Sequence, residues 1–281
     1  MKEQIQKAID DMKSKVGRDS KHIYINNETG DWLQGVSTVS SIVPKDWLSA
    51  WGAKETVKFL GYSDYEGDVS VAETMLKKIK NLDIPAYLRL LKEAKGASMR
   101  KSKQALVDGK AGHDWIENFV LAKITAKNTP ALPGGLLDRP LTQFMEWEAK
   151  EIDYWIASEV FVCRLDKKYA GQLDAIAMMK SGKLALIDFK FASGISEDYY
   201  LQTAGYAACF EPYGIKFDDR IIVRLPKTVE MDSWNKELYK YEKVPNNIEV
   251  KSVPTPYEID REAFFCALPL KQWINFVTKN N

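Results

Sequence analysis

The sequence predicts a mixed α/β (α+β) fold, in which a central mixed β-sheet is flanked by helices and preceded by a helical N-terminal region. Three observations carry this prediction. Up to about residue 156, apolar residues recur mainly at helical spacing. Beyond that point, apolar runs of strand length alternate with turn residues. The 281 residues are 45% hydrophobic, which is typical of a chain that buries a full core.

The N-terminal part is predicted to begin with a β-hairpin and to continue as helices. Residues 22–43, starting at His22, alternate in polarity on both sides of the turn-forming segment 26–31, which favours a hairpin. Pro44 is well placed to open a helix through Trp51. Helical spacing then recurs in 71–79, 85–94, 110–124 and, after a Pro/Gly-rich loop at 128–135, in 141–156.

Strands dominate the second half of the chain. Three consecutive strands are expected at 159–165, 169–178 and 184–189, with a tight turn at 181–183. A helix at 197–210, strands at 220–225 and 237–244, and a closing helix at 257–277 complete the prediction. We therefore expect an N-terminal hairpin and helical region, residues 1–105, and a core, residues 106–281, which together form one compact unit.

Composition and motifs disfavour several classes of protein. The polar N-terminal segment does not resemble a signal peptide and no run of about eighteen apolar residues occurs, so we expect a cytoplasmic protein without a membrane partner. The cysteines Cys163, Cys209 and Cys266 are far apart and odd in number, which argues against a disulfide framework or a clustered zinc site and predicts ordinary buried thiols. No phosphate-binding G-x-x-x-x-G-K-S/T loop occurs, so ATPase or helicase activity is not expected.

Charge is balanced overall but segregated locally. The net charge is +1, yet the segment from Lys77 to Lys110 has ten basic residues against three acidic ones. Such a segment is either a solvated helical face or a surface for an anionic partner such as DNA. In the second case, Arg100, Lys103 and Lys110 are candidates for contacting the substrate.

Two carboxylates and a lysine are predicted to meet on neighbouring strands. Asp174 lies toward the middle of one strand, and Asp188 and Lys190 end the next strand after a short turn, so that a hairpin brings them together. Residues two apart on a strand point the same way, which places the lysine ammonium beside Asp188. Paired carboxylates suit a hard divalent cation, and the lysine would orient or deprotonate the attacking water or stabilise charge on the phosphate. The alternative is that these are surface or turn residues joined by an ion pair.

Further polar residues have spacings that would bring them near this site. Gln202 and Tyr206 are four apart and share a helix face, where they would contact phosphate or base; alternatively, Tyr206 is a core aromatic. His113 and Glu117 are also four apart, so that His113 is either a third metal ligand beside a catalytic carboxylate or a structural histidine. Glu159, at the start of its strand, either assists the metal, fixes the lysine, or is a surface glutamate.

Taken in order, these residues resemble the motifs of RecB-type exonucleases in the PD-(D/E)XK nuclease superfamily. The resemblance covers residues 105–225 and rests on Gly109-x-x-x-His113-x-x-x-Glu117, Glu159, Gly171-Gln-Leu-Asp174, Ile187-Asp188-Phe189-Lys190 and Gln202-x-x-x-Tyr206. The stretch 169–190 is particularly similar to the phage and mitochondrial genome maintenance exonuclease branch.

The resemblance implies a restriction-endonuclease-like core with a site for Mg²⁺ or Mn²⁺. The ion would be held by His113, Asp174, Asp188 and the main-chain carbonyl of Phe189, with Lys190 as the catalytic lysine. The helices that precede the core would guide the substrate. No iron–sulfur cluster is expected, because the related members that carry one use four cysteines and this chain has three.

Two residues depart from the family pattern. Phe191 stands where a threonine usually follows the lysine, and Lys110 stands where a threonine commonly follows the motif glycine. The catalytic residues themselves are all present. The resulting hypothesis is hydrolysis of DNA phosphodiesters by a metal-activated water, with an exonuclease on linear or single-stranded ends favoured and with partners in recombination or replication in a bacterial or phage-infected cell. The alternatives are a structure-selective endonuclease and a catalytically silent DNA-binding accessory protein.

Overall fold

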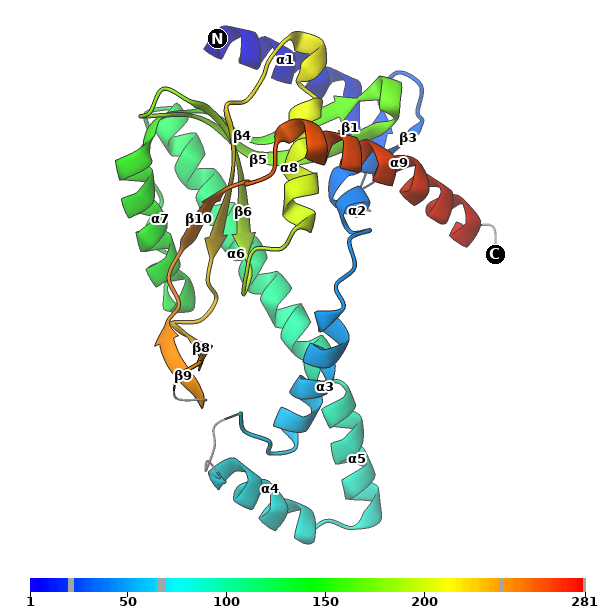
Figure 1. The fold of residues 1–281 in the computed structure, drawn as a ribbon, viewed down its shortest axis with the longest axis vertical. Helices are drawn as coiled ribbons and strands as arrows, with labels where there is room; N and C mark the ends of the chain where they lie inside the picture. The colour runs from blue at the N-terminus through cyan, green and yellow to red at the C-terminus, as the bar shows by residue number, and fades with distance from the viewer. Residues whose placement is uncertain (20–22, 65–68, 238–239, 280–281) are drawn as a thin grey trace. The chain divides into compact units, whose positions relative to one another are not determined.

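The computed structural model describes residues 1–19, 23–64, 69–237 and 240–279 and divides the chain into two compact units (Figure 1). The first, here called the sheet unit, comprises Met1–Val43, Ala111–Lys227 and Asn247–Asn281. The second, the helical unit, comprises Pro44–Lys110 and Thr228–Asn246. Residues 1–43 therefore belong with the core, whereas the sequence grouped them with the helical region 1–105, because their apolar side chains are buried in the core of the sheet unit.

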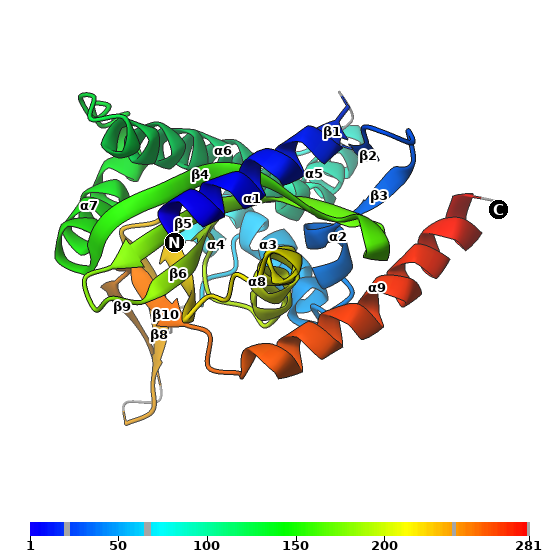
Figure 2. The same ribbon diagram turned by 90° about the horizontal axis from the view of Figure 1, so that it is seen from above.

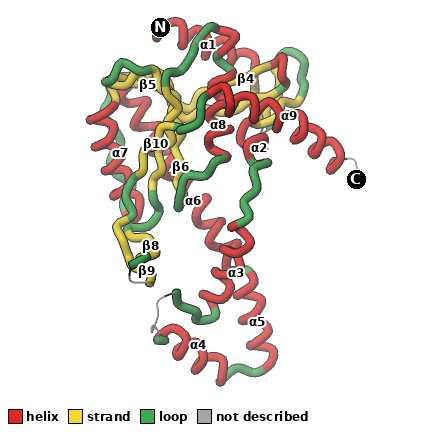
Figure 3. Tube along the Cα trace, viewed as in Figure 1, coloured by secondary structure: helices red, strands yellow, loops and turns green. Residues whose placement is uncertain are grey.

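The sheet unit is built on an eight-stranded mixed sheet, which confirms the predicted central mixed sheet (Figure 3). Its strands are β1 (Val16–Arg18), β2 (Tyr24–Asn26), β3 (Trp32–Gly35), β4 (Ile152–Arg164), β5 (Tyr169–Met179), β6 (Leu184–Phe191), β7 (Asp219–Leu225) and β10 (Glu249–Ser252). Their order is β1-β2-β3-β5-β6-β7-β10, and β4 pairs with β5. The pairs β3·β5 and β6·β7 are parallel, and the others are antiparallel.

Helices flank this sheet, as the sequence predicted, and they pack on it in two groups. They are α1 (Lys2–Lys15), α2 (Val36–Ser40), the C-terminal part of α6 (Ala97–Ile124), α7 (Asp138–Glu151), α8 (Asp198–Ala208) and α9 (Tyr257–Lys279), with 3-10 turns at Gly135–Leu137, Leu165–Lys167 and Glu211–Tyr213. The helices α1, α2, α8 and α9 share one buried apolar cluster with the sheet, and α6 and α7 share a second. Figures 1 and 2 show α8 and α9 side by side.

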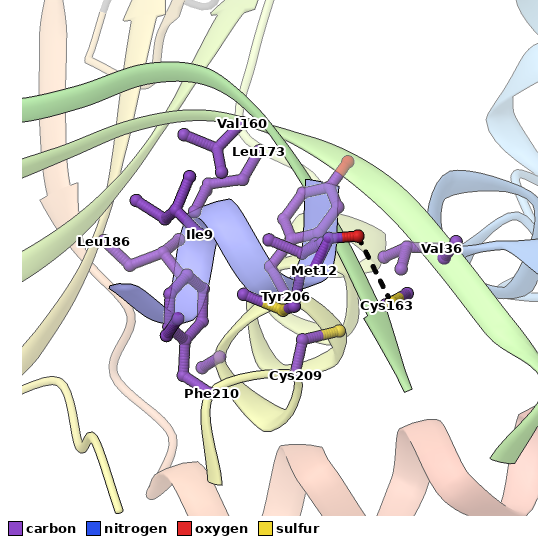
Figure 4. Close-up of a cluster of buried hydrophobic side chains, with 14 of the residues drawn as sticks. Ile9, Met12, Val36, Val160, Cys163, Leu173, Leu186, Tyr206, Cys209 and Phe210 are labelled. Atoms are coloured by element: carbon purple, nitrogen blue, oxygen red, sulfur yellow. Dashed lines mark hydrogen bonds between the residues drawn. The ribbon is translucent and has the colours of Figure 1, made fainter. Parts of the chain in front are cut away.

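The first helix, α1, was absent from the prediction and contributes to the first of these clusters. Its residues Ile5, Ala8, Ile9 and Met12 recur at helical spacing and are buried, although most of the helix is polar. Figure 4 shows Ile9 and Met12 in the same cluster as the strand residue Leu173. A short apolar stripe in a charged segment forms a stable helix only when a neighbouring surface buries it, so sequence alone gave a weak signal.

The motif glycine Gly171 is required by close packing against α8. A Cβ atom at this position would lie 2.6 Å from the ring of Tyr206 and 3.0 Å from the side chain of Val36. Tyr206 is only 4% exposed. The glycine therefore lets the tyrosine ring lie against β5, three residues before Asp174 on the same strand.

Several predicted boundaries are wrong. The predicted helix 141–156 ends at Glu151, and Ile152 begins β4, which extends through the predicted strand 159–165 because it pairs along its length with β5. The hairpin is confirmed for β2 and β3, although the chain turns into α2 at Val36 and His22 lies outside the described residues. The strand that carries Asp188 continues to Phe191. The predicted strands 169–178, 184–189 and 220–225 and the helices 197–210 and 257–277 are confirmed to within two residues.

The cysteines agree only in part with the expectation of buried thiols. Cys163 and Cys209 are buried, and burial raises the pKa of the Cys163 thiol to about 11. Cys266 on α9 is exposed, so the expectation is wrong for this residue. Within the described residues, no helix combines the length and the apolar character that crossing a membrane requires.

The helical unit contains α3 (Trp47–Phe59), α4 (Ser70–Lys80), α5 (Ile84–Lys95), the first part of α6 and a two-stranded sheet of β8 (Glu230–Asn235) and β9 (Lys240–Pro245). The predicted helices 71–79 and 85–94 are confirmed, but the helix expected to open at Pro44 begins at Trp47. The helix α6 begins at Ala97, before the predicted start at 110. The prediction missed residues 97–110 because this mostly exposed stretch has no clear apolar stripe to mark it as a helix in the sequence. The predicted strand 237–244 corresponds to β9, and residues 238–239 lie outside the described part of the chain.

Candidate metal centre

Strand register aligns three carboxylates across the middle of the sheet. Ser158 and Val160 of β4 pair with Ala175 and Leu173 of β5, so Glu159 stands opposite Asp174. On the other side of β5, Ala175 pairs with Ile187 of β6, and continuing this register by one residue puts Asp174 opposite Asp188. The hairpin predicted from the turn at 181–183 is therefore confirmed, and it brings both aspartates to one place.

The ladders that β3 and β6 form with β5 both stop short of Asp174, whereas β4 stays paired with β5 on either side of it. One end of β5 pairs with β3 at Tyr169 and Ala170, and its other end pairs with β6 from Ala175 onward. Past this last pair, the N–H of Phe189 donates to the Asp174 carboxylate over 2.6 Å instead of to a strand carbonyl. The side chain of Asp174 thus satisfies a main-chain donor where the ladder ends, and it is fixed beside the carboxylates.

Glu159 has a backbone conformation that is unusual for its residue type. Its φ angle is +49°, in the left-handed region, although it lies inside a strand. Such strained conformations persist only where the surrounding structure maintains them, and they cluster at functional sites. The sequence placed Glu159 at the start of its strand; it lies instead in the interior of β4, and it is half-buried. It also lines a cavity of about 270 Å³ between α1, α6 and β4.

Helix α6 adds a histidine to these acids. Potential ligand atoms of His113, Glu159 and Asp174 all lie within 4.8 Å of one another, and His113 Nδ1 is 4.0 Å from Asp174 Oδ2. Glu117, one turn further along α6, is outside this group, and its pKa is raised by burial and by the nearby Asp114. Carboxylate oxygens suit Mg²⁺ and Mn²⁺, and an imidazole completes a mixed donor set, so the residues present fit a divalent cation.

Lys190 lies beside this group and is held by Asp188. Its ammonium nitrogen is 2.9 Å from Asp188 Oδ1 and 2.7 Å from Oδ2, as expected for residues two apart on a strand. The ammonium also lies 5.0 Å from the ring centroid of Tyr199, at the start of α8. Asp188 is fully buried, whereas the lysine side chain keeps 17% of its surface exposed. Because the pair is buried and lies beside other acids, the alternative of a surface ion pair is excluded.

Three acidic side chains lie near one lysine, and burial disfavours the charged form of each acid. Burial raises the pKa of Glu159 to about 8, and the neighbouring Asp174 adds to the effect. Burial also raises the pKa of Asp174 and, against the opposing charge of Lys190, that of Asp188 to about 6. Burial would lower the pKa of Lys190, but the charges of Asp188 and Asp174 outweigh it and raise that pKa. A bound cation would relieve the repulsion between the acids.

Metal affinity should therefore rise with pH. Ligands must be deprotonated to bind a cation, so a proton on Glu159 competes with the metal below a pKa of about 8, and deprotonation of the neighbouring Asp188, whose pKa is about 6, adds negative charge beside the site. Burial lowers the His113 pKa to about 4, so the imidazole is already neutral in this range. We expect the Mn²⁺ dissociation constant, measured by calorimetry, to fall in steps between about pH 5 and about pH 9. Glu159→Gln should remove the upper step, and a pH-independent constant in the parent would contradict the assignment of these ligands.

The remaining predicted residues lie in different surroundings. Gln202 Nε2 donates to the Tyr206 hydroxyl over 2.9 Å, and both residues are buried. Their burial favours the alternative that Tyr206 is a core aromatic over contact of these residues with phosphate or base. The side chain of Phe189 is buried in the aromatic cluster under α7, while its main-chain N–H faces Asp174. Its carbonyl as a ligand stays a prediction.

The three basic candidates belong to the helical unit. Lys103 and Lys110 are exposed. Arg100 donates to the carbonyl of Glu93 over 2.8 Å and lies over the ring of Phe59, so it has a structural role within that unit. Their contact with a substrate stays a prediction.

Two contacts of the site were missed by sequence reasoning. Tyr199 beside Lys190 has no motif to identify it, because aromatic residues near a helix start are common in cores. The ring of Phe191 lies against His113, with centroids 5.4 Å apart. The only signal for Phe191 in the sequence was that it stands where the exonucleases that the chain resembles usually have a threonine.

The chain matches no family model and has no match among curated proteins. An inference of function therefore starts from the side chains of this site.

Proposed function

We propose that the chain is a metal-dependent DNA nuclease with a restriction-endonuclease-like PD-(D/E)XK core, acting as an exonuclease on linear or single-stranded ends. One observation carries this proposal: a group of possible cation ligands, His113, Glu159 and Asp174, lies beside a buried lysine–aspartate pair on the adjacent strand. A divalent cation with a fixed ammonium beside it would stabilise the negative charge that develops on a phosphate during phosphodiester hydrolysis.

The candidate ligands and the Asp188–Lys190 pair have different roles in the phosphodiester hydrolysis that we propose. His113, Glu159 and Asp174 would hold Mg²⁺ or Mn²⁺, which when bound supplies Lewis-acid polarisation of a phosphate oxygen and makes water a better nucleophile. Asp188 fixes the Lys190 ammonium through two short contacts. The ammonium would stabilise the negative charge that develops on the phosphate, or hold the attacking water.

The decisive experiment is digestion of labelled DNA by the full-length protein. Linear single- and double-stranded oligonucleotides with 5′ or 3′ labels, together with closed circles, should be incubated with Mg²⁺ or Mn²⁺ and with a chelator. We expect linear DNA to be degraded in the presence of either ion and to stay intact when the chelator is present. Closed circles should stay intact under all these conditions. Cutting of circles would indicate the structure-selective endonuclease. Binding without cutting under any metal would indicate the silent accessory protein and overturn the proposal.

The basic segment of the helical unit gives a separate prediction about DNA binding. All ten of its lysines and arginines are exposed, on α4, α5 and α6. Exposed Tyr87, Trp47 and Tyr62 in the same unit are suited to stacking on bases. DNA affinity should therefore fall steeply with salt, because each neutralised phosphate releases a counterion.

Replacing Lys77, Lys78 and Lys80 with alanine should weaken DNA binding and flatten its salt dependence. Each lost phosphate contact lowers the slope of log affinity against log salt by about 0.7 for single strands. Fluorescence anisotropy at several salt concentrations measures this slope. The same change at Lys7, Lys150 and Lys183, three exposed lysines of the sheet unit, is the charge-matched control. Equal slopes for the two triple variants would remove the basic segment from the binding surface.

A further inference from the structure

The last residue of β6, Phe191, occupies a notch in helix α6. Its side chain is 8% exposed, and it lies over Gly112 so closely that a Cβ atom there would be 2.1 Å from its Cζ and 2.3 Å from its Cε1. Real Cβ atoms do not approach other atoms this closely, so the phenyl ring can occupy this place only because residue 112 is a glycine.

The same ring contacts the neighbouring residue of α6, the candidate ligand His113. The two rings meet edge to face, with an interplanar angle of 60° and centroids 5.4 Å apart. The imidazole also lies near Asp174, with Nδ1 4.0 Å from the carboxylate oxygen Oδ2. With 32% of its side chain exposed, His113 is not fixed by burial alone.

We propose that Phe191 is a positioning residue for the metal centre: its ring, seated in the notch at Gly112, holds the His113 imidazole toward Asp174 so that both can bind one divalent ion. This inference rests on the metal site of the proposed function. It links the end of β6 to α6 through a contact that no main-chain pairing provides.

Helix propensity and packing make opposite predictions for Gly112→Ala. Alanine is a better helix former than glycine, so propensity alone predicts a neutral or stabilised helix. The packing predicts that the new methyl group displaces the Phe191 ring and, with it, the imidazole. Partners that orient a metal ligand typically contribute about 10- to 100-fold to metal affinity, and we expect a loss of Mn²⁺ affinity in this range.

The test measures Mn²⁺ binding to the full-length chain by calorimetry, without DNA, and thermal unfolding of the same samples. Phe191→Ala and Gly112→Ala should each weaken Mn²⁺ binding by about 10- to 100-fold. Phe191→Leu should weaken it less, because the leucine side chain still fills part of the notch. The double variant Gly112→Ala/Phe191→Ala should lose less thermal stability than the two single losses added together, because the clash is gone, yet its Mn²⁺ affinity should stay low.

Gly205 provides a matched control in the same unit. A Cβ at Gly205 on α8 would lie 2.6 Å from the ring of the buried Phe264, so Gly205→Ala creates a similar clash at a pair that does not include His113. It should lower the melting temperature and leave the Mn²⁺ dissociation constant of the folded protein within twofold of the parent, a change of about 0.4 kcal/mol or less.

The outcomes separate this inference from the proposed function. If the parent binds Mn²⁺ and Phe191→Ala binds it equally well, Phe191 only packs, and the positioning role is overturned while the metal centre stands. If the parent binds no Mn²⁺, both are overturned. Should Gly112→Ala fail to fold, the ranking of parent, Phe191→Leu and Phe191→Ala decides, and a ranking other than decreasing affinity in that order overturns the inference.

Discussion

Lys190→Met should lower the rate of DNA hydrolysis by about 10²- to 10⁴-fold, the usual range for a group that stabilises charge or transfers a proton in the transition state. Lys190 contributes the ammonium that Asp188 holds at 2.7 Å beside the possible cation ligands. Methionine has a similar length and no charge, so it removes the ammonium while filling its space. Single-turnover digestion of a labelled linear oligonucleotide measures the effect on chemistry directly.

A loss of stability has to be separated from a loss of catalysis in this variant. Lys190→Met leaves the fully buried Asp188 without its partner. Breaking a buried ion pair destabilises the folded protein by about 3–5 kcal/mol, and this loss is smaller if the Asp188 carboxyl binds a proton. Lys190→Arg keeps a positive charge against Asp188 but changes its shape and position. We expect Lys190→Arg to melt close to the parent and still hydrolyse DNA at least about 10-fold more slowly. If both variants cut as fast as the parent, Lys190 has no catalytic role.

Asp174→Asn should reduce Mn²⁺ affinity at least about 100-fold and abolish measurable hydrolysis. Loss of a residue that only orients a metal ligand already lowers metal affinity by about 10- to 100-fold, and loss of a ligand itself should lower it more. Asp174 is the one carboxylate that both belongs to the possible ligand group and stands between Glu159 and Asp188 in register. The amide keeps the shape of the side chain but removes its negative charge. Calorimetry with Mn²⁺ and the digestion assay measure the two effects.

Comparison with Asp174→Ala distinguishes the two tasks of this side chain. Asparagine keeps an oxygen that accepts from the N–H of Phe189, a bond of 2.6 Å in the parent, whereas alanine leaves that donor without its partner. An unmet buried donor costs about 1–3 kcal/mol, so Asp174→Ala should be less stable than Asp174→Asn by that amount. Both variants should lose metal binding alike. Normal Mn²⁺ affinity in Asp174→Asn would show that this carboxylate does not bind the ion.

The hairpin that carries the two aspartates could be predicted from the sequence because its determinants are local. A short turn at 181–183 joins two apolar runs, and the turn fixes the register of β5 against β6. The spacing of two between Asp188 and Lys190 likewise fixes their side chains on one face of one strand. The place of His113 beside these acids depended on the resemblance, since spacing gives no information on where a helix packs.

Glu159, Gln202 and Tyr206 show why local patterns were insufficient elsewhere. The sequence could not tell whether Glu159 faced the metal or the solvent, because that depends on a left-handed backbone conformation inside β4 and on its pairing with β5. Gln202 and Tyr206 do share a helix face, as predicted, but that face is buried against Gly171 and the core. Helical spacing identifies residues that lie together and does not say what covers them.

The sequence by itself determined the strands β5, β6 and β7, the β5–β6 hairpin and the proximity of Asp174, Asp188 and Lys190, because these follow from side-chain periodicity and a tight turn. Only the tertiary structure decided that β3 and β6 pair with different ends of β5, that Glu159 joins the ligand group and that Phe191 rests in the notch at Gly112. These features depend on pairings between segments far apart in the chain, and their energies come from burial and close packing, which no local pattern of residues encodes.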